Sequence, residues 1–530
     1  MSRAEALTLA LVSALAGGVV APYVFDGLGL DIAPRLTAGV ILAAGIVVAT
    51  TATARDDRTA DLVVPLAGCG TTTAVLLWLA PDALPPGSGP DLTHHLLLAG
   101  YIQGHGTLVH DPNAAAAIGE MAQYTPGLHA LSAVAATLLG TETLFTIYPI
   151  LVATVALKFS LVALSVLRLV GDHPGRLALA MATIALLFSV PSYTLGSFVH
   201  DSFLAQVASE LFAIAMFWAL VAWNQQPSWW TIGVFALCGT AAFLTWPIWI
   251  GPPVTALVLL CLLRRDLGSG ITIRQAAAAI GPIALVAVAH LFGRSSGLGL
   301  AGTSGAVSLP ALSAVGSSLL VVTLAGLILS AGTTLTRPLL AIVVALALQA
   351  GALWLVARER GATTPYMSLK TTFLAIYPLA MAAVIALARV SRTRLWAVAV
   401  AALSFSLAVR EVAAMPPAAP TVRRDLWAAG EWARAHTSPA CVDYLVANEY
   451  TAYWLHLAVL GNARSAARST DQATYDTQAS FARWLSDAGG APYAIARASA
   501  LPAEIRDRFP AVFREGDAVV LSRPSACAER

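Results

Sequence analysis

The sequence is short of charge. Only 11% of its 530 residues are Asp, Glu, Lys or Arg, whereas 58% are hydrophobic, and the mean hydropathy is +0.74. Soluble globular domains carry roughly 25% charged residues. The shortfall argues against an ordinary soluble domain, and a net charge of +2 gives no basis for nucleic-acid binding. We therefore expect the chain to lie in a lipid bilayer.

Lysine and cysteine are also scarce. Lys158 and Lys370 are the only lysines, so each needs an explanation of its own. The five cysteines show no metal-type spacing, which argues against a cysteine-based zinc site. Cys69, Cys238 and Cys261 fall in apolar runs, where a buried cysteine is simply a small apolar residue.

Apolar runs of the length that crosses a bilayer, about 20 residues, recur along most of the chain. They predict an all-α polytopic protein with about thirteen transmembrane helices, near 6–24, 36–53, 61–80, 130–155, 176–191, 203–223, 230–248, 251–263, 275–293, 311–334, 338–357, 371–388 and 395–413. The stretch 130–170 fits either one long span plus a short packed helix, or two spans.

The arginines predict the orientation. With the N-terminus in the cytoplasm, the inner loops hold Arg55, Arg58, Arg168, Arg176, Arg264, Arg265, Arg274, Arg337, Arg389, Arg392 and Arg394. The outer loops hold only Arg35, Arg294, Arg358, Arg360 and Lys370. This asymmetry satisfies the positive-inside rule.

The chain divides into a membrane domain, residues 1–416, and a small extracytoplasmic α/β domain, residues 417–530. In the second part, "TVRRDLWAAGEWARAHT" and "EYTAYWLHLAVLG" predict helices, and "CVDYLVAN", "PYAIARAS" and "DAVVLSRP" predict strands. Cys441 and Cys527 are its only cysteines, and an extracytoplasmic pair can form a disulfide. They can equally remain apart.

The long first outer loop, 81–128, gathers titratable groups in "PDLTHHLLLAGYIQGHGTLVHD". Pro90 fits the first turn of a helix, which puts Asp91, His94 and His95 on one helix face. Asp91 is a candidate general base for a sugar hydroxyl, and either histidine could orient it or bind a phosphate. The plainer alternative is an acid that suits the helix dipole, beside interfacial histidines.

The same loop also contains Asp111 and Glu120, and it ends in "QYTPGLHAL". We assign Asp111, Tyr124 and His129 to substrate binding, together with His94 and His95. A zinc site formed by His94, His95, His105 and His110 is a third interpretation of the loop, although the spacing matches no standard ligand set.

The second outer loop, "PSYTLGSFVHDSF", offers His200 and Asp201 as substrate-binding residues. Gln206 and Glu210 follow at the top of the next span. Ionisable groups there either face the protein interior or cap the span by reaching toward the headgroups.

The third outer loop, "RERGATTPYMSLK", offers Arg358, Arg360, Tyr366 and Lys370. A lysine at an outer span end opposes the positive-inside bias, so a lipid phosphate is a fitting partner for Lys370. The alternative is ordinary snorkelling to the headgroups. The motif "TWPIWIGPP", 245–253, is explained most simply by an aromatic belt at the interface.

The layout resembles the GT-C superfamily of integral membrane glycosyltransferases. The resemblance rests on "GPDLTHH" followed by "QYTPGLHAL", on "SFVHDSFLAQVASELF" and "TTPYMSLKTTFLAIYPLA", and on the tail "AAGEWARAHTSPACVDYL". It implies inverting transfer of a sugar from a polyprenyl-phosphate donor to a glycan, lipid or protein acceptor outside a bacterial inner (plasma) membrane. Asp91 would be the base and Lys370 a donor-phosphate ligand.

One feature departs from the commoner pattern of that superfamily. Asp91 has no DxD or paired Asp-Glu around it, so a divalent metal ion stays open as a cofactor, and Asp111, Glu120 and Asp201 remain substitute bases. A transporter or flippase of a lipid-linked or polar substrate is the alternative function, although no inverted repeat is visible. A non-catalytic scaffold would leave the clustered titratable groups unexplained.

Overall fold

The computed structural model describes residues 1–51, 59–86, 90–111, 114, 118–263, 269–293, 314–330, 333–418, 420, 423–438, 441–460, 477–486 and 491–524. Five arginines that entered the orientation argument lie outside these ranges: Arg55, Arg58, Arg264, Arg265 and Arg294. Cys527 and the side chain of Glu120 are also outside the described part.

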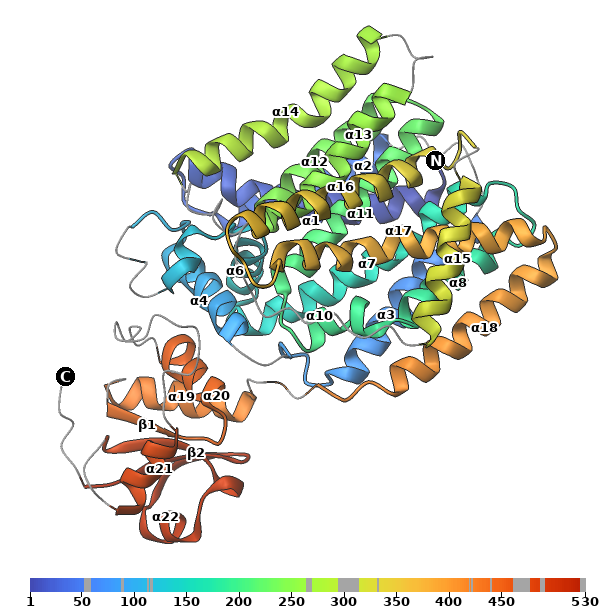
Figure 1. The fold of residues 1–530 in the computed structure, drawn as a ribbon. Coiled ribbons are helices and arrows are strands. Elements are labelled where there is room, and N and C mark those ends of the chain that lie inside the picture. Colours follow the sequence, from blue (N-terminus) through green and yellow to red (C-terminus); the bar gives the residue numbers. More distant parts are fainter. Residues whose placement is uncertain are drawn as a thin grey trace.

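The protein is a bundle of apolar helices with a small sheet at one end (Figure 1). Nine described helices are long and apolar enough to cross a membrane: α1 (Arg3–Gly27), α2 (Pro34–Thr51), α3 (Val63–Leu79, after η1, Thr59–Leu62), α7 (Leu144–Val170), α11 (Leu204–Gln225), α14 (Ser269–Gly293), α16 (Arg337–Glu359), α17 (Tyr366–Val390) and α18 (Arg394–Ala413).

Five further apolar helices are shorter: α6 (Gly127–Leu139), α8 (Arg176–Phe188), α12 (Trp229–Thr245), α13 (Gly251–Leu263, after η3, Pro247–Ile250) and α15 (Ala314–Ser330). Four of them coincide with predicted spans, so the count of thirteen stays a prediction. Between 130 and 170 the helix breaks at Gly140, whose φ of 63° is left-handed. The short helix α6 therefore precedes the single long helix α7, and the choice between one span and two stays a prediction.

Helices α7 and α11 form the centre of the bundle. The whole apolar window of α11 and 89% of that of α7 are buried, against 11% for α2 and 28% for both α16 and α18. The outer helices expose large apolar side chains such as Leu285 (72%) and Leu395 (80%). Such broad apolar exposure fits a surface that contacts lipid.

Three core helices meet at a buried charged contact, which we call the core lock: Lys158, Glu210 and Tyr377. The Lys158 Nζ lies 2.5 Å from Glu210 Oε2, and the Tyr377 hydroxyl donates to the same oxygen at 2.8 Å. Lys158, Glu210 and Tyr377 are 0%, 1% and 0% exposed. The lock gives Lys158 its partner, and it shows that Glu210 faces the interior rather than capping a span.

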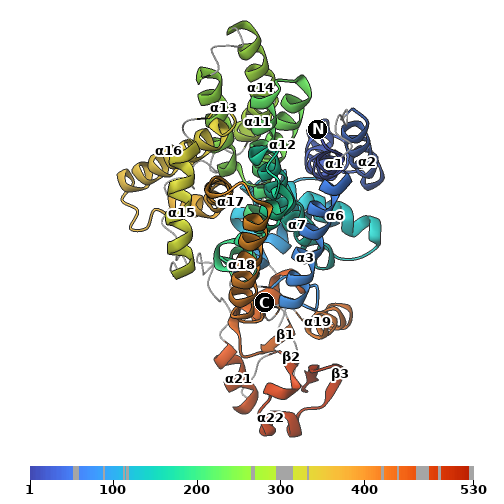
Figure 2. The same ribbon diagram turned by 90° about the vertical axis from the view of Figure 1, so that its right-hand side faces the viewer.

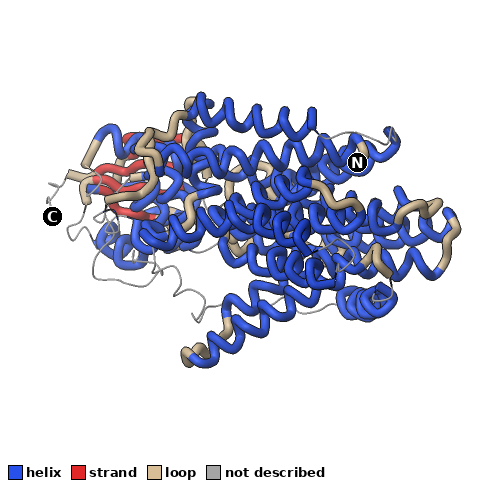
Figure 3. Tube along the Cα trace, turned by 90° about the horizontal axis from the view of Figure 1, so that it is seen from above, coloured by secondary structure: helices blue, strands red, loops and turns tan. Residues whose placement is uncertain are grey.

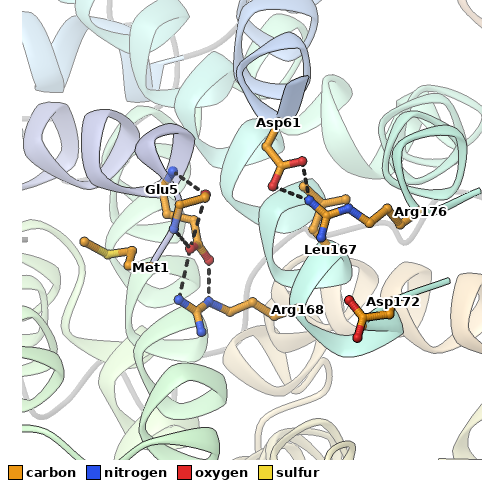
Figure 4. A pocket seen from close by; sticks show the side chains of 9 residues that line it. Met1, Glu5, Asp61, Leu167, Arg168, Asp172 and Arg176 are labelled. Atoms are coloured by element: carbon orange, nitrogen blue, oxygen red, sulfur yellow. Dashed lines mark hydrogen bonds and ion pairs between the residues drawn. The ribbon is translucent and has the colours of Figure 1, made fainter. Parts of the chain in front are cut away.

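A polar pocket of about 250 Å³ lies at the end of the bundle near the N-terminus (Figure 4). Two ion pairs line it, between Arg168 and Glu5 and between Arg176 and Asp61. They join α1 to α7 and η1 to α8. Every arginine drawn there is paired with a carboxylate, so the pairs tie helix ends together.

The C-terminal part holds α19 (Arg424–His436), β1 (Val442–Leu445), α20 (Glu449–Trp454), η7 (Leu455–Val459), α21 (Thr477–Ser486), β2 (Tyr493–Arg497), η8 (Ala498–Ala500), α22 (Ala503–Arg508), β3 (Ala511–Glu515) and β4 (Ala518–Ser522). The strands gather at one end of the molecule (Figure 3), and this part projects from the bundle (Figure 2).

The sheet order is β1-β2-β4-β3, with β1 parallel to β2 and the other two pairs antiparallel. Leu445, Ala494 and Leu521 share one buried cluster with Trp484 of α21, whereas α19 packs against β2, β3 and β4. The predicted helices and three strands are present. Strand β3 was not predicted, because its residues are mostly exposed and show no apolar alternation. Cys441 is buried and disulfide-bonded.

The core lock makes a prediction about stability. Lys158→Met leaves Glu210 charged and unpaired inside the bundle, which costs about 3–5 kcal/mol of unfolding free energy. Replacing both partners, Lys158→Met with Glu210→Leu, should recover most of that loss. Thermal unfolding of the purified protein in detergent measures both changes, and a double variant no more stable than the single one would contradict the account.

Candidate functional site

Helix α4 (Pro90–His105) carries Asp91 in its first turn. His94 and His95 follow one turn later and are both buried, whereas Asp91 is half-buried. His94 Nε2 lies 3.0 Å from the Tyr453 hydroxyl, and His95 Nδ1 lies 2.8 Å from His129 Nε2. The two histidines therefore hold α4 to different neighbours: His94 to the C-terminal domain and His95 to α6.

Local packing explains the start of α6. A Cβ on Gly127 would lie 2.7 Å from the carbonyl oxygen of Leu244, so only glycine fits against the end of α12. The Thr125 hydroxyl donates to the Thr245 carbonyl oxygen at 3.0 Å beside it. This close approach brings His129, half a turn further on, under α4.

Lys370 lies in the first turns of α17 and is only 3% exposed. Its Nζ is 3.7 Å from the ring centroid of Phe203, 4.5 Å from that of Tyr366 and 5.0 Å from that of Trp246. Lys370 forms no salt bridge with a residue in the described ranges. A caged, buried ammonium is not snorkelling, so that alternative is wrong.

Asp201 reaches the same region from the second outer loop, which folds into α9 (Pro191–Thr194) and α10 (Gly196–Val199). Ser202 has a left-handed φ of 56°, a rare conformation for a residue with a side chain. Its hydroxyl donates to the Pro86 carbonyl oxygen at 3.2 Å, which fixes this turn against the approach to α4. The turn separates exposed Asp201 from Phe203, whose ring lies against Lys370.

The charge interactions among these groups indicate that they lie near one another. Burial raises the pKa of Asp201. The charges of His200 and Lys370 lower that pKa, and the charge of Asp91 raises it. Burial also raises the pKa of Tyr124, and Asp91 and Tyr366 add to that rise. We call this set the chamber: Asp91, His95, Tyr124, His129, Asp201, Phe203, Trp246, Tyr366 and Lys370.

Burial lowers the pKa of His95 well below its usual value, and the charges of His129, His94 and Lys370 lower it further. The Tyr124 ring lies 5.7 Å from that of His95 and 5.9 Å from that of Trp246. His95 therefore stays neutral, and Tyr124 lies between the rings of His95 and Trp246, the latter 5.0 Å from Lys370 Nζ.

Other predicted site residues stay apart from this group. Asp111 is exposed, and the Arg358 guanidinium stacks over Trp354 at 5.3 Å, at an exposed position near exposed Arg360. The zinc interpretation is wrong as drawn, because its histidines have separate neighbours. His105 contacts the Tyr101 carbonyl oxygen at 2.9 Å, and His110 contacts Asp26. Within the described ranges no three His, Cys, Asp or Glu side chains gather as a metal site would require.

Sequence reasoning missed Phe203 and Trp246. Trp246 and Trp249 are 7% and 0% exposed, so they line the interior, and the aromatic-belt interpretation is wrong for them. The signal was present in the clustering of tryptophan and proline at 245–253. Which rings surround a cation depends on helix docking.

Fold and site together define a polytopic membrane protein in which one buried cation, Lys370, interacts electrostatically with two acids, Asp91 and Asp201. No protein-family model matches the chain, and no curated protein matches its sequence.

Solved structures give weak likenesses. ArnT from Cupriavidus metallidurans, bound to undecaprenyl phosphate, has a TM-score of 0.47 at 16% identity, over 89% of this chain and 100% of that one. The Archaeoglobus fulgidus oligosaccharyltransferase in complex with Zn and sulfate has a TM-score of 0.45 at 15% identity, over 82% of this chain and 68% of that one. These scores carry no functional argument, so function is argued from the side chains.

His95 makes a prediction about pH. Because its folded pKa lies below the ordinary value of about 6.5, the unfolded chain binds a proton first as the pH falls. Stability should therefore be complete above about pH 6.5 and decline below it. His95→Gln should flatten this decline by up to about 1.4 kcal/mol per pH unit.

The measurement is thermal unfolding in detergent between about pH 5 and 7.5, with the exposed His105→Gln as matched control. Equal slopes for wild type and His95→Gln would show that His95 does not stay neutral in the folded protein.

Proposed function

We propose that this chain is an integral membrane glycosyltransferase of the GT-C kind, which moves a sugar from a polyprenyl phosphate to an acceptor hydroxyl. One observation carries the proposal: Lys370 is a buried ammonium caged by aromatic rings, without a salt bridge to a described residue, beside the carboxylates of Asp91 and Asp201. A buried cation that is held by aromatic rings rather than by a direct ion pair is suited to bind an anion.

Lys370 would bind the phosphate of the donor. When the bond between the anomeric carbon and the phosphate oxygen breaks, negative charge develops on that oxygen. An ammonium held in a buried site stabilises this charge more than water would. The rings of Phe203, Tyr366 and Trp246 hold the cation in place without neutralising it.

Asp91 would act as the general base. The acceptor hydroxyl attacks the anomeric carbon from the side opposite the phosphate, which inverts the configuration, and its proton passes to the carboxylate. Asp201 is the second acid in the chamber and the substitute base. Burial raises the pKa of Asp201, so it holds a proton more readily than an ordinary aspartate.

The proposed setting is a bacterial plasma membrane, with the chamber and the C-terminal domain outside. Arg168 and Arg176 lie at the opposite end of the bundle, where the positive-inside rule expects them. The donor's polyprenyl chain would lie among the apolar helices, and the acceptor would be a glycan, lipid or protein approaching from outside. No cofactor enters this scheme, and a divalent metal ion remains an open addition.

The test is turnover of a panel of undecaprenyl-phosphoryl sugars by the purified protein. Asp91→Asn should lower kcat by about 10²–10⁴-fold and leave donor binding intact, because only the base is lost. Lys370→Met should instead weaken binding of undecaprenyl phosphate itself. Asp82→Asn, which alters an exposed acid near the start of the same loop, is the matched control and should retain full activity.

Other results would redirect the proposal. Retained turnover in Asp91→Asn with loss in Asp201→Asn would move the base to Asp201. No turnover by wild type with any donor and a broad acceptor set would reject the transferase, and lipid flux in liposomes would then test the transporter.

A further inference from the structure

Helix α4 is held from two sides, by His95 toward the bundle and by His94 toward the C-terminal domain. The His94–Tyr453 contact joins residues 359 positions apart in the sequence. His94 is 4% exposed and Tyr453 is 1% exposed, and their rings meet edge to face at 5.9 Å. A buried polar contact of this kind is costly to break, because water cannot readily replace either partner at so small an exposure.

The approach to α4 is tied to the same domain. Pro86 forms a bridge with Pro420 in the linker that leads to α19, and the Ala418 amide donates to the Leu79 carbonyl oxygen at 3.3 Å. The Pro86 carbonyl oxygen also accepts from Ser202. The linker, the start of the first outer loop and the turn beside Asp201 therefore meet where the chain enters α4.

The domain also contacts the bundle beyond α4. The Trp427 ring of α19 lies 6.0 Å from that of Phe145 at the start of α7, and the Arg424 guanidinium lies 5.6 Å from the same ring. Helix α20 and η7 pack on α4 itself. Docking on two separate helices fixes the orientation of the domain, so Tyr453 presents its hydroxyl to His94 from a defined direction.

Asp91 depends on this arrangement, because it lies one helical turn before His94 on the same face. A rotation of α4 that broke the His94 contact would also turn Asp91 relative to Lys370. We propose that Tyr453 is a positioning residue, through which the C-terminal domain holds α4 and thereby sets the proposed base. This inference rests on the proposed function only for its effect on turnover; its structural part stands alone.

The test compares two single-atom changes in one domain. Tyr453→Phe removes the hydroxyl that meets His94, whereas Tyr444→Phe removes a hydroxyl that lies 3.0 Å from His456 Nδ1 within the domain. Tyr453→Phe should lower kcat about tenfold and leave the donor KM unchanged, because the Lys370 cage is untouched. Tyr444→Phe should leave both constants unchanged.

A double-mutant cycle isolates the contact. His94→Leu should resemble Tyr453→Phe, and combining them should cost little more than either alone. His94→Gln should recover part of the activity, because its amide can still reach the tyrosine hydroxyl. Fully additive losses would overturn the inference, since the two side chains would then act separately.

Amide hydrogen exchange across residues 92–105 tests the structural part without any substrate. Exchange should become faster in Tyr453→Phe and stay unchanged in Tyr444→Phe, even if no donor is ever turned over. Unchanged exchange in Tyr453→Phe would overturn the positioning role. Faster exchange with normal kcat in an active enzyme would also overturn it, and an inactive wild type would count only against the proposed function.

Discussion

The core lock of Lys158, Glu210 and Tyr377 fixes the register of the helices that carry the site. Glu210 lies seven residues after Phe203, and Tyr377 lies seven residues after Lys370. Phe203 immediately precedes α11, and seven helical residues rise about 10.5 Å, so the two contacts have about the same spacing along both chain segments. The helices therefore run parallel and in step. Because burying an ion pair is costly in itself, the lock contributes more to register than to stability.

The only two lysines of the chain show two solutions to one problem. Lys158 and Lys370 are both buried, at 0% and 3% exposure. Lys158 is neutralised by direct contact with Glu210. Lys370 is held by aromatic faces instead, each worth up to about 2 kcal/mol where water is excluded. The charge of Lys158 is compensated by a carboxylate of the fold, whereas the charge of Lys370 can still interact with a ligand.

Sequence reasoning reached the features that local pattern determines. Run length located the apolar helices, and helical spacing placed Asp91, His94 and His95 together on α4. The partners of these residues depend on packing between distant segments. The sequence around Lys158 does not predict its contact with Glu210, 52 positions away. The sequence around His94 likewise does not predict its contact with Tyr453. Trp246 belongs to an aromatic motif at the end of α12. Whether that motif faces lipid or the interior depends on how α12 packs against the bundle.

The balance of charge in the chamber links its acids to its proposed ligand. With Asp91 and Asp201 both ionised, the carboxylates outnumber the ammonium of Lys370, and His95 adds no charge because burial lowers its pKa. An anion entering such a chamber would meet net repulsion. Burial already raises the pKa of Asp201, and a donor phosphate beside it would raise that pKa further. Proton uptake by Asp201 would remove one negative charge as the phosphate arrives. Asp201 thus has the environment of an acid that holds its proton more readily than an ordinary aspartate, which suits it to a place beside a phosphate.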